Sequence, residues 1–128
     1  MKAMRISDLA RAGGVGVETV RFYQRKGLLA FPRGDAPAGR HYDDEDLRRL
    51  RYVKQAQAAG FTLAEIAELL DLHRSDDRPR AREMASARIA ALDAQIAALQ
   101  SARQSLSRLA QDCAKGGAGP CPILDAFG

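Results

Sequence analysis

The chain has no tryptophan, few other aromatic residues, only two cysteines and two histidines. It also lacks any apolar run approaching the roughly 20 residues that a membrane span requires, and its first residues lack the apolar stretch of a secretory signal. We therefore expect a cytoplasmic protein that has no membrane partner. Two cysteines in such a chain favour a functional site over a structural disulfide.

The two histidines give no indication of an enzyme. Neither His41 nor His73 has an obvious triad or ligand partner in its segment, and no nucleophile has an adjacent base. The 128 residues are 46% hydrophobic and 28% charged, which is typical of one small folded core with an extended appendage.

The positive charge is concentrated in the first part of the chain. Residues 1–54 contain 12 Lys or Arg and 7 Asp or Glu, whereas residues 55–128 contain 8 and 9. This asymmetry favours a polyanion as the partner of the basic part.

Residues 17–29 predict a recognition helix of a DNA-binding domain. Helical spacing gives an inward face at Val17, Val20 and Leu28, and Gly27 ends the helix in a left-handed conformation. Side chains that could reach a DNA groove or a phosphate are Thr19, Arg21, Tyr23 and Arg25. A short helix begins after a serine cap at Ser7 and breaks at Gly13-Gly14, which completes a helix-turn-helix pattern.

The next segment, from Phe31 to Tyr42, is rich in proline and glycine and predicts a two-stranded hairpin, or wing. Asp43 then caps a helix that stops at Gly60. A capping box formed by Thr62 and Glu65 opens another helix, residues 63–72.

A long helix follows the charged connector. Pro79 suits its first turn, and the next 30 or so residues contain neither glycine nor proline. Apolar residues recur along it at heptad spacing: Ala85, Ile89, Leu92, Ile96, Leu99, Leu106 and Ala110. At 1.5 Å per residue this helix is about 50 Å long, too long to bury its apolar seam on the small N-terminal domain. We therefore expect a homodimer with a coiled coil.

The predicted fold is mainly α. A winged helix-turn-helix domain spans residues 1–72, a connector 73–78, a dimerisation helix 79–112, and a metal-binding loop with the C-terminal tail 113–128.

Three segments together resemble the MerR family of bacterial transcription regulators: residues 17–29, residues 39–42 (Gly-Arg-His-Tyr) and residues 53–70. The resemblance covers essentially the whole chain. It implies a homodimer joined by antiparallel long helices, bound to double-stranded promoter DNA together with RNA polymerase, which changes transcription by twisting and bending that DNA. Carried over from the family, the DNA contacts are Arg21, Tyr23, Arg40, Tyr42 and Lys54.

Cys113 and Cys121 bracket a glycine-rich loop at the end of the long helix, where this family carries its effector site. Two thiolates can hold a soft d10 ion between them, namely Cu(I), Ag(I), Au(I) or Hg(II). The Cys-x7-Cys-Pro pattern resembles that of copper-efflux regulators of the CueR type, so we favour Cu(I), Ag(I) or Au(I). A closed zinc site is disfavoured, since it requires four ligands.

Two alternatives stay open at this point. The DNA-binding half resembles mercury regulators, which would make the protein a sensor of Hg(II) or another divalent ion. The divalent sensors of the family carry a third cysteine at a position that falls here at or near Arg78, and Asp76 or Asp77 could supply oxygen ligands instead. The other alternative is a thiol-redox sensor in which the two cysteines form a reversible disulfide.

Overall fold

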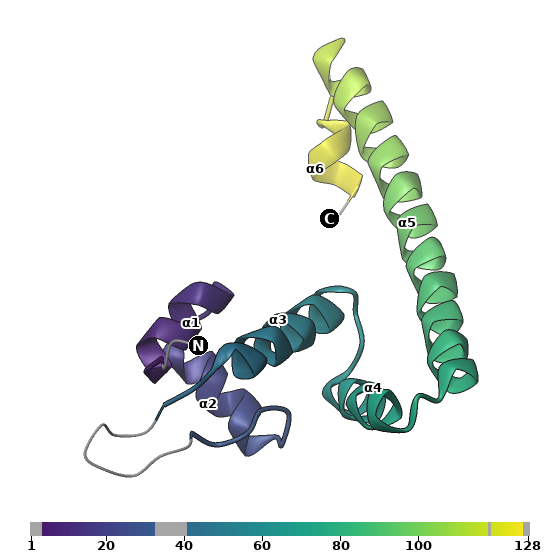
Figure 1. Ribbon diagram of the computed structural model, residues 1–128. Helices are drawn as coiled ribbons and strands as arrows, with labels where there is room; N and C mark the ends of the chain where they lie inside the picture. Colours follow the sequence, from purple (N-terminus) through teal and green to yellow (C-terminus); the bar gives the residue numbers. More distant parts are fainter. Residues whose placement is uncertain (1–3, 33–40, 118, 127–128) are drawn as a thin grey trace. The chain divides into compact units, whose positions relative to one another are not determined.

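The computed structural model describes residues 4–32, 41–117 and 119–126, and most of these residues are helical (Figure 1). The helices are α1 (Ile6–Gly13), α2 (Val17–Arg25), α3 (Asp44–Ala58), α4 (Leu63–Ser75), α5 (Arg78–Ala114) and α6 (Pro122–Ala126). The predicted mainly α fold is confirmed. None of the helices in the described part combines the length and the hydropathy that crossing a membrane requires.

Two compact units divide the chain, residues 1–84 and residues 85–128, so that α5 begins in the first unit and continues in the second. The hydrophobic core lies in the first unit. Its members come from α1 to α4 and the segments between them: Leu9, Ala10, Val20, Tyr23, Leu28, Leu29, Tyr42, Leu50, Val53 and Ile66.

The helix-turn-helix is formed by α1 and α2, as the glycine pair predicted. Gly14 has a positive φ of 71° and turns the chain after α1. Gly13 lies so close to α3 that a Cβ built on it would collide with Leu50 Cδ2. Gly27 also has a positive φ, 76°, and lies just after the end of α2, as expected. Gly13 and Gly14 thus let α1 pack closely on α3 and turn into α2.

One helix boundary was predicted wrongly. We expected Ser7 to cap α1, but the helix begins at Ile6 and its N-cap is Arg5. The side chain of Asp8 accepts a hydrogen bond of 3.1 Å from the Arg5 backbone nitrogen. This bond stabilises an earlier start, because it satisfies a backbone donor that a helix beginning at Asp8 would leave free.

The caps predicted for the next two helices are present. Asp43 and Asp46 form a capping box at the start of α3, and Thr62 and Glu65 form one at the start of α4. Helix α4 continues to Ser75, three residues beyond the domain end expected at residue 72.

Most of the expected wing, including Arg40, lies outside the described residues. The segment that follows it is fixed to the N-terminal end of the chain. Tyr42 and Met4 exchange two backbone hydrogen bonds, of 2.8 and 2.7 Å, in an isolated antiparallel bridge. Tyr42 is therefore held beside Met4, which lies two residues before the start of α1.

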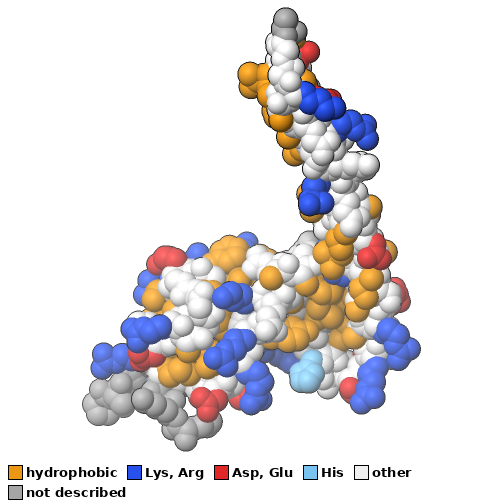
Figure 2. Space-filling model, turned by 90° about the horizontal axis from the view of Figure 1, so that it is seen from above, with side chains coloured by type: hydrophobic (Ala, Val, Ile, Leu, Met, Phe, Trp, Pro, Cys, Tyr) orange, Lys and Arg blue, Asp and Glu red, His pale blue; other side chains and the backbone are white. Residues whose placement is uncertain are grey.

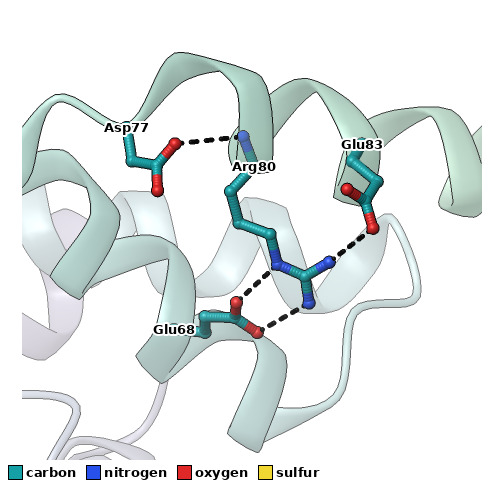
Figure 3. Close-up of polar contacts among 4 residues, drawn as sticks. All are labelled: Glu68, Asp77, Arg80 and Glu83. Carbon is teal, nitrogen blue, oxygen red and sulfur yellow. Dashed lines mark hydrogen bonds and ion pairs between the residues drawn. The ribbon is translucent and has the colours of Figure 1, made fainter.

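Helices α4 and α5 are joined by a cluster of charged side chains (Figure 3). The Arg80 guanidinium on α5 contacts both carboxylate oxygens of Glu68 on α4, with Nε to Oε2 at 2.7 Å and Nη2 to Oε1 at 3.2 Å. It also contacts Glu83 one turn along α5. Asp77 accepts a hydrogen bond from the Arg80 backbone nitrogen and so helps to cap α5.

Candidate nucleic-acid interface and cysteine site

Helix α2 presents a basic, exposed face. Arg21, Arg25 and Lys26 are exposed and Thr19 is half-buried, while Val20 and Tyr23 point into the core. The Arg21 guanidinium forms an exposed ion pair with Glu18 at 3.0 Å, so its charge is available to a phosphate at little cost. Figure 2 shows that Lys and Arg side chains, in blue, are distributed widely over the surface of the N-terminal unit.

The two tyrosines expected to contact DNA are packed in the core, 4% and 3% exposed. The hydroxyl of Tyr23 donates to Gln57 Oε1 on α3 at 2.6 Å, and burial raises its pKa. The hydroxyl of Tyr42 accepts a hydrogen bond of 2.8 Å from Gln24 Nε2. The i, i+3 and i+4 positions of Val20, Tyr23 and Gln24 on one helix face were the sequence signal for this burial.

Basic side chains of α3 contact the turns of the helix-turn-helix. Lys54 Nζ donates to the carbonyl oxygens of Gly13 and Gly14 at 3.3 and 3.1 Å. Arg49 Nε donates to Leu28 O at 2.7 Å, and Arg51 Nη2 to Ala12 O at 3.4 Å. The family resemblance selected Lys54, whereas sequence reasoning missed the two arginines, whose carbonyl partners lie 21 and 39 residues away.

The two cysteines lie close together in the second unit. Cys113 is in the last turn of α5 and Cys121 directly precedes α6. Their sulfur atoms are 2.9 Å apart, and both thiols are half-buried. Between them Gly116, Gly117 and Gly119 have positive φ values of 71°, 128° and 126°, which residues with a Cβ rarely adopt. The glycines thus let the chain reverse and bring Cys121 back to Cys113.

The two thiols differ in acidity. Hydrogen bonding to Cys121 raises the pKa of Cys113, with burial adding to the effect. The same bond lowers the pKa of Cys121, and the backbone N–H groups of Leu124 and Ile123 lower it further. Cys121 is therefore the sulfur that ionises first, and a thiolate is the form that binds metal ions.

Within the described residues no group of three or more His, Cys, Asp or Glu side chains could surround an ion. Asp76 and Asp77, which we considered as oxygen ligands, serve the junction between α4 and α5. Asp76 ends α4 with a positive φ of 54° and pairs with Arg78 at 3.4 Å. The described part of one chain thus supplies two sulfur donors.

The apolar seam of α5 is exposed in the single chain. Ile89, Ile96, Leu99 and Leu106 are between 47% and 70% exposed. In Figure 2, hydrophobic side chains of the C-terminal unit lie open on its surface, in orange. An exposed apolar seam of this kind is typical of helices that pack against another helix.

Two family models match the chain: "MerR HTH family regulatory protein" over residues 4–72 and "MerR, DNA binding" over residues 47–109. A mercuric resistance operon regulatory protein of Pseudomonas fluorescens is 41% identical over 127 residues, 97% of this chain and 87% of that protein. The HTH-type transcriptional regulator CueR of Salmonella typhimurium is 34% identical over 128 residues, 95% of this chain and 90% of that protein.

A solved structure is also similar along its whole length. The transcription regulator PbrR691 of Ralstonia metallidurans CH34, crystallised in complex with lead(II), has a TM-score of 0.68 and 32% identity. The alignment covers 98% of this chain and 99% of that one. Each of the three alignments covers at least 95% of this chain.

Proposed function

Because the chain belongs to the MerR family of helix-turn-helix regulatory proteins, we propose that it is a homodimeric, metal-responsive transcription regulator. In this proposal it binds promoter DNA and switches transcription by distorting that DNA when a soft metal ion binds Cys113 and Cys121. One observation carries the metal response: the glycine loop brings the two sulfur atoms to 2.9 Å of each other.

For the DNA interface we propose contacts from Thr19, Arg21 and Arg25 on α2, from Lys54 on α3, and from Arg40. Arginine and lysine contacts to phosphates fix the position of a protein on the duplex and account for most of the salt dependence of its affinity. Exposure of the α2 arginines supports this assignment.

Tyr23 and Tyr42 are buried as whole residues, so for both we propose a phosphate contact from the hydroxyl group only, which is the polar end of the side chain. Tyr42 accepts the bond from Gln24, and among the described residues no acceptor takes its own hydroxyl proton. It can donate that proton to a phosphate. Tyr23 already donates to Gln57, so it would have to break that bond first.

The donor set suits a soft ion of low coordination number. If each metal–sulfur bond is ~2.3 Å, as for zinc thiolates, an ion held linearly between two thiolates separates the sulfurs by up to ~4.6 Å. The present separation is 2.9 Å, so binding pushes the sulfurs apart. Two-thiolate coordination favours Cu(I), Ag(I) or Au(I).

The switch is proposed to act through the dimer. Opening the cysteine loop at the end of α5 would change how the two long helices are held against each other. Because the DNA-binding units are carried by those helices, the duplex between the two half-sites would be twisted and bent, so that RNA polymerase can engage the promoter. Distorting DNA has its own free-energy cost, which is separate from the free energy of the phosphate contacts.

Mercury(II) is the second candidate ion. The 41% identity to a mercuric resistance regulator exceeds the 34% identity to CueR. Two thiolates can also hold Hg(II). We rank it second because the position at which the family's divalent sensors have a third cysteine is at or near Arg78, and arginine cannot ligate a cation.

The test is operator-dependent transcription by the reduced protein, titrated with Cu(I), Ag(I), Hg(II) and Zn(II). We expect activation by the monovalent ions, with loss of the response in Cys113→Ser and in Cys121→Ser and retention of operator binding by both variants. Activation by Hg(II) alone would show that the protein is a mercury(II) sensor, the second candidate. A response to oxidant in the presence of a metal chelator would instead establish the thiol-redox alternative.

A further inference from the structure

A cavity of about 600 Å³ lies in the N-terminal unit between α3 and α4, a volume typical of small-molecule sites. It is lined by Arg49 and Tyr52 of α3, by Leu70, His73 and Arg74 of α4, and by Ala30, which follows α2. Neither cysteine contributes to it. The metal-binding proposal therefore does not account for this cavity.

The charges that line the cavity are not balanced. The carboxylates at its edge are already engaged: Glu45 pairs with Arg48, and Asp46 accepts the Asp43 backbone N–H at 2.8 Å. In contrast, the side chains of Arg74 and His73 form no hydrogen bond or ion pair with another described residue. Arg49 uses only its Nε, in the bond to Leu28 O. The cavity therefore presents guanidinium donors from two different helices.

Its remaining surface is apolar. Tyr52 is 42% exposed, and Leu70 is partly buried against the core. A tyrosine ring offers a flat surface for another ring, and a guanidinium binds a carboxylate through two parallel hydrogen bonds. Together these groups match a ligand with a carboxylate at one end and a flat apolar body at the other.

We propose that this cavity is a binding site for a small aromatic carboxylate. The carboxylate contacts Arg74 and Arg49, and the ring lies against Tyr52 and Leu70. Such a ligand touches α3 and α4 at once, so its binding stabilises the N-terminal unit by mass action. This site is a second route to regulation, separate from the cysteine loop.

The experiment is an NMR titration of the full-length, reduced, metal-free protein with 2-naphthoate, and in parallel with the neutral 2-naphthamide. We expect the amide signals of Tyr52, Leu70 and Arg74 to shift with naphthoate and not with naphthamide. Equal binding of the two compounds would overturn the carboxylate assignment. No shift at millimolar naphthoate would overturn the site itself.

The matched variants are Arg74→Gln and Arg82→Gln, since Arg82 is an exposed arginine outside the cavity. Arg74→Gln should weaken naphthoate binding about tenfold, the usual effect of removing a hydrogen bond to a charged group, and Arg82→Gln should leave it unchanged. A double Cys113→Ser/Cys121→Ser variant should bind naphthoate normally, which separates this proposal from the metal response. Displacement of naphthoate by operator DNA would assign the cavity to the DNA-binding surface and overturn the proposal.

Discussion

Arg80 and Glu68 form a two-contact ion pair that joins the first turn of α5 to α4, at 2.7 and 3.2 Å. The geometry is the parallel arrangement in which a guanidinium binds a carboxylate most strongly. Because the two residues belong to consecutive helices, the pair ties the first turn of α5 to α4 within the N-terminal unit.

The pH dependence of this ion pair is the first prediction. The hydrogen bond from Arg80 lowers the pKa of Glu68. The ion pair therefore stabilises the fold at pH values above the pKa of glutamate in the unfolded chain, about 4.3. This stabilisation is lost as the pH falls through the lower pKa that Glu68 has in the folded chain. Glu68→Gln should therefore reduce the difference in melting temperature between pH 7 and pH 3. Glu83→Gln, which removes only the exposed contact to Arg80, is the control and should have a smaller effect. Equal effects of the two variants would show that the α4–α5 contact has no special role.

The buried tyrosines give the second prediction. Tyr23→Phe should lower the free energy of unfolding by about 1 kcal/mol, because it leaves Gln57 without its donor. Tyr42→Phe should weaken operator binding more than Tyr23→Phe does, since only Tyr42 has a hydroxyl proton not already used in a described hydrogen bond. Urea denaturation and DNA-binding isotherms measure the two quantities. If Tyr23→Phe weakened operator binding more than Tyr42→Phe did, the proposed DNA contact from the Tyr42 hydroxyl would be wrong.

Local interactions in this chain were predicted better from the sequence than distant ones. The capping box of Thr62 and Glu65 and the left-handed Gly27 were predicted correctly, since each depends on neighbours within a few residues. The Ser7 cap was wrong, although local, because Asp8 offered the backbone an earlier partner.

The tertiary interactions that sequence reasoning missed join distant segments. The Tyr23–Gln57 bond spans 34 residues, and the Glu68–Arg80 pair joins two helices. Such contacts depend on how the helices pack, which a pattern along one helix does not contain. The cysteine pair could be predicted from the sequence because the glycine-rich loop between the two cysteines is short.

The third prediction concerns phosphate contacts. Arg21→Ala should weaken operator binding and make the slope of log affinity against log salt shallower by about one unit. Arg108→Ala, on the exposed surface of α5 away from the apolar seam, is the control and should leave affinity and slope unchanged. If both variants bind as the unmodified protein does, Arg21 lies outside the interface.

The fourth prediction concerns the homodimer. Leu99 is 70% exposed in the single chain and lies on the apolar seam of α5. Leu99→Asp should dissociate or unfold the dimer, because it would bury a charge at an apolar interface. Gln100→Asp adds the same charge beside the seam and should leave the dimer intact. Sedimentation of the unmodified protein as a monomer at micromolar concentration would rule out the coiled coil.

The last prediction follows from the unequal acidity of the two thiols. Because hydrogen bonds from Cys113 and from the Leu124 and Ile123 backbone lower the pKa of Cys121, Cys121 is the more ionised sulfur at neutral pH. Iodoacetamide reacts with thiolates, so it should modify Cys121 before Cys113 in the metal-free reduced protein, as read by peptide mass spectrometry. Cys113→Ala removes the bond from Cys113 and should shift the alkylation of Cys121 to higher pH. Faster modification of Cys113, or an unchanged pH profile in that variant, would mean that the 2.9 Å contact does not polarise the pair in solution.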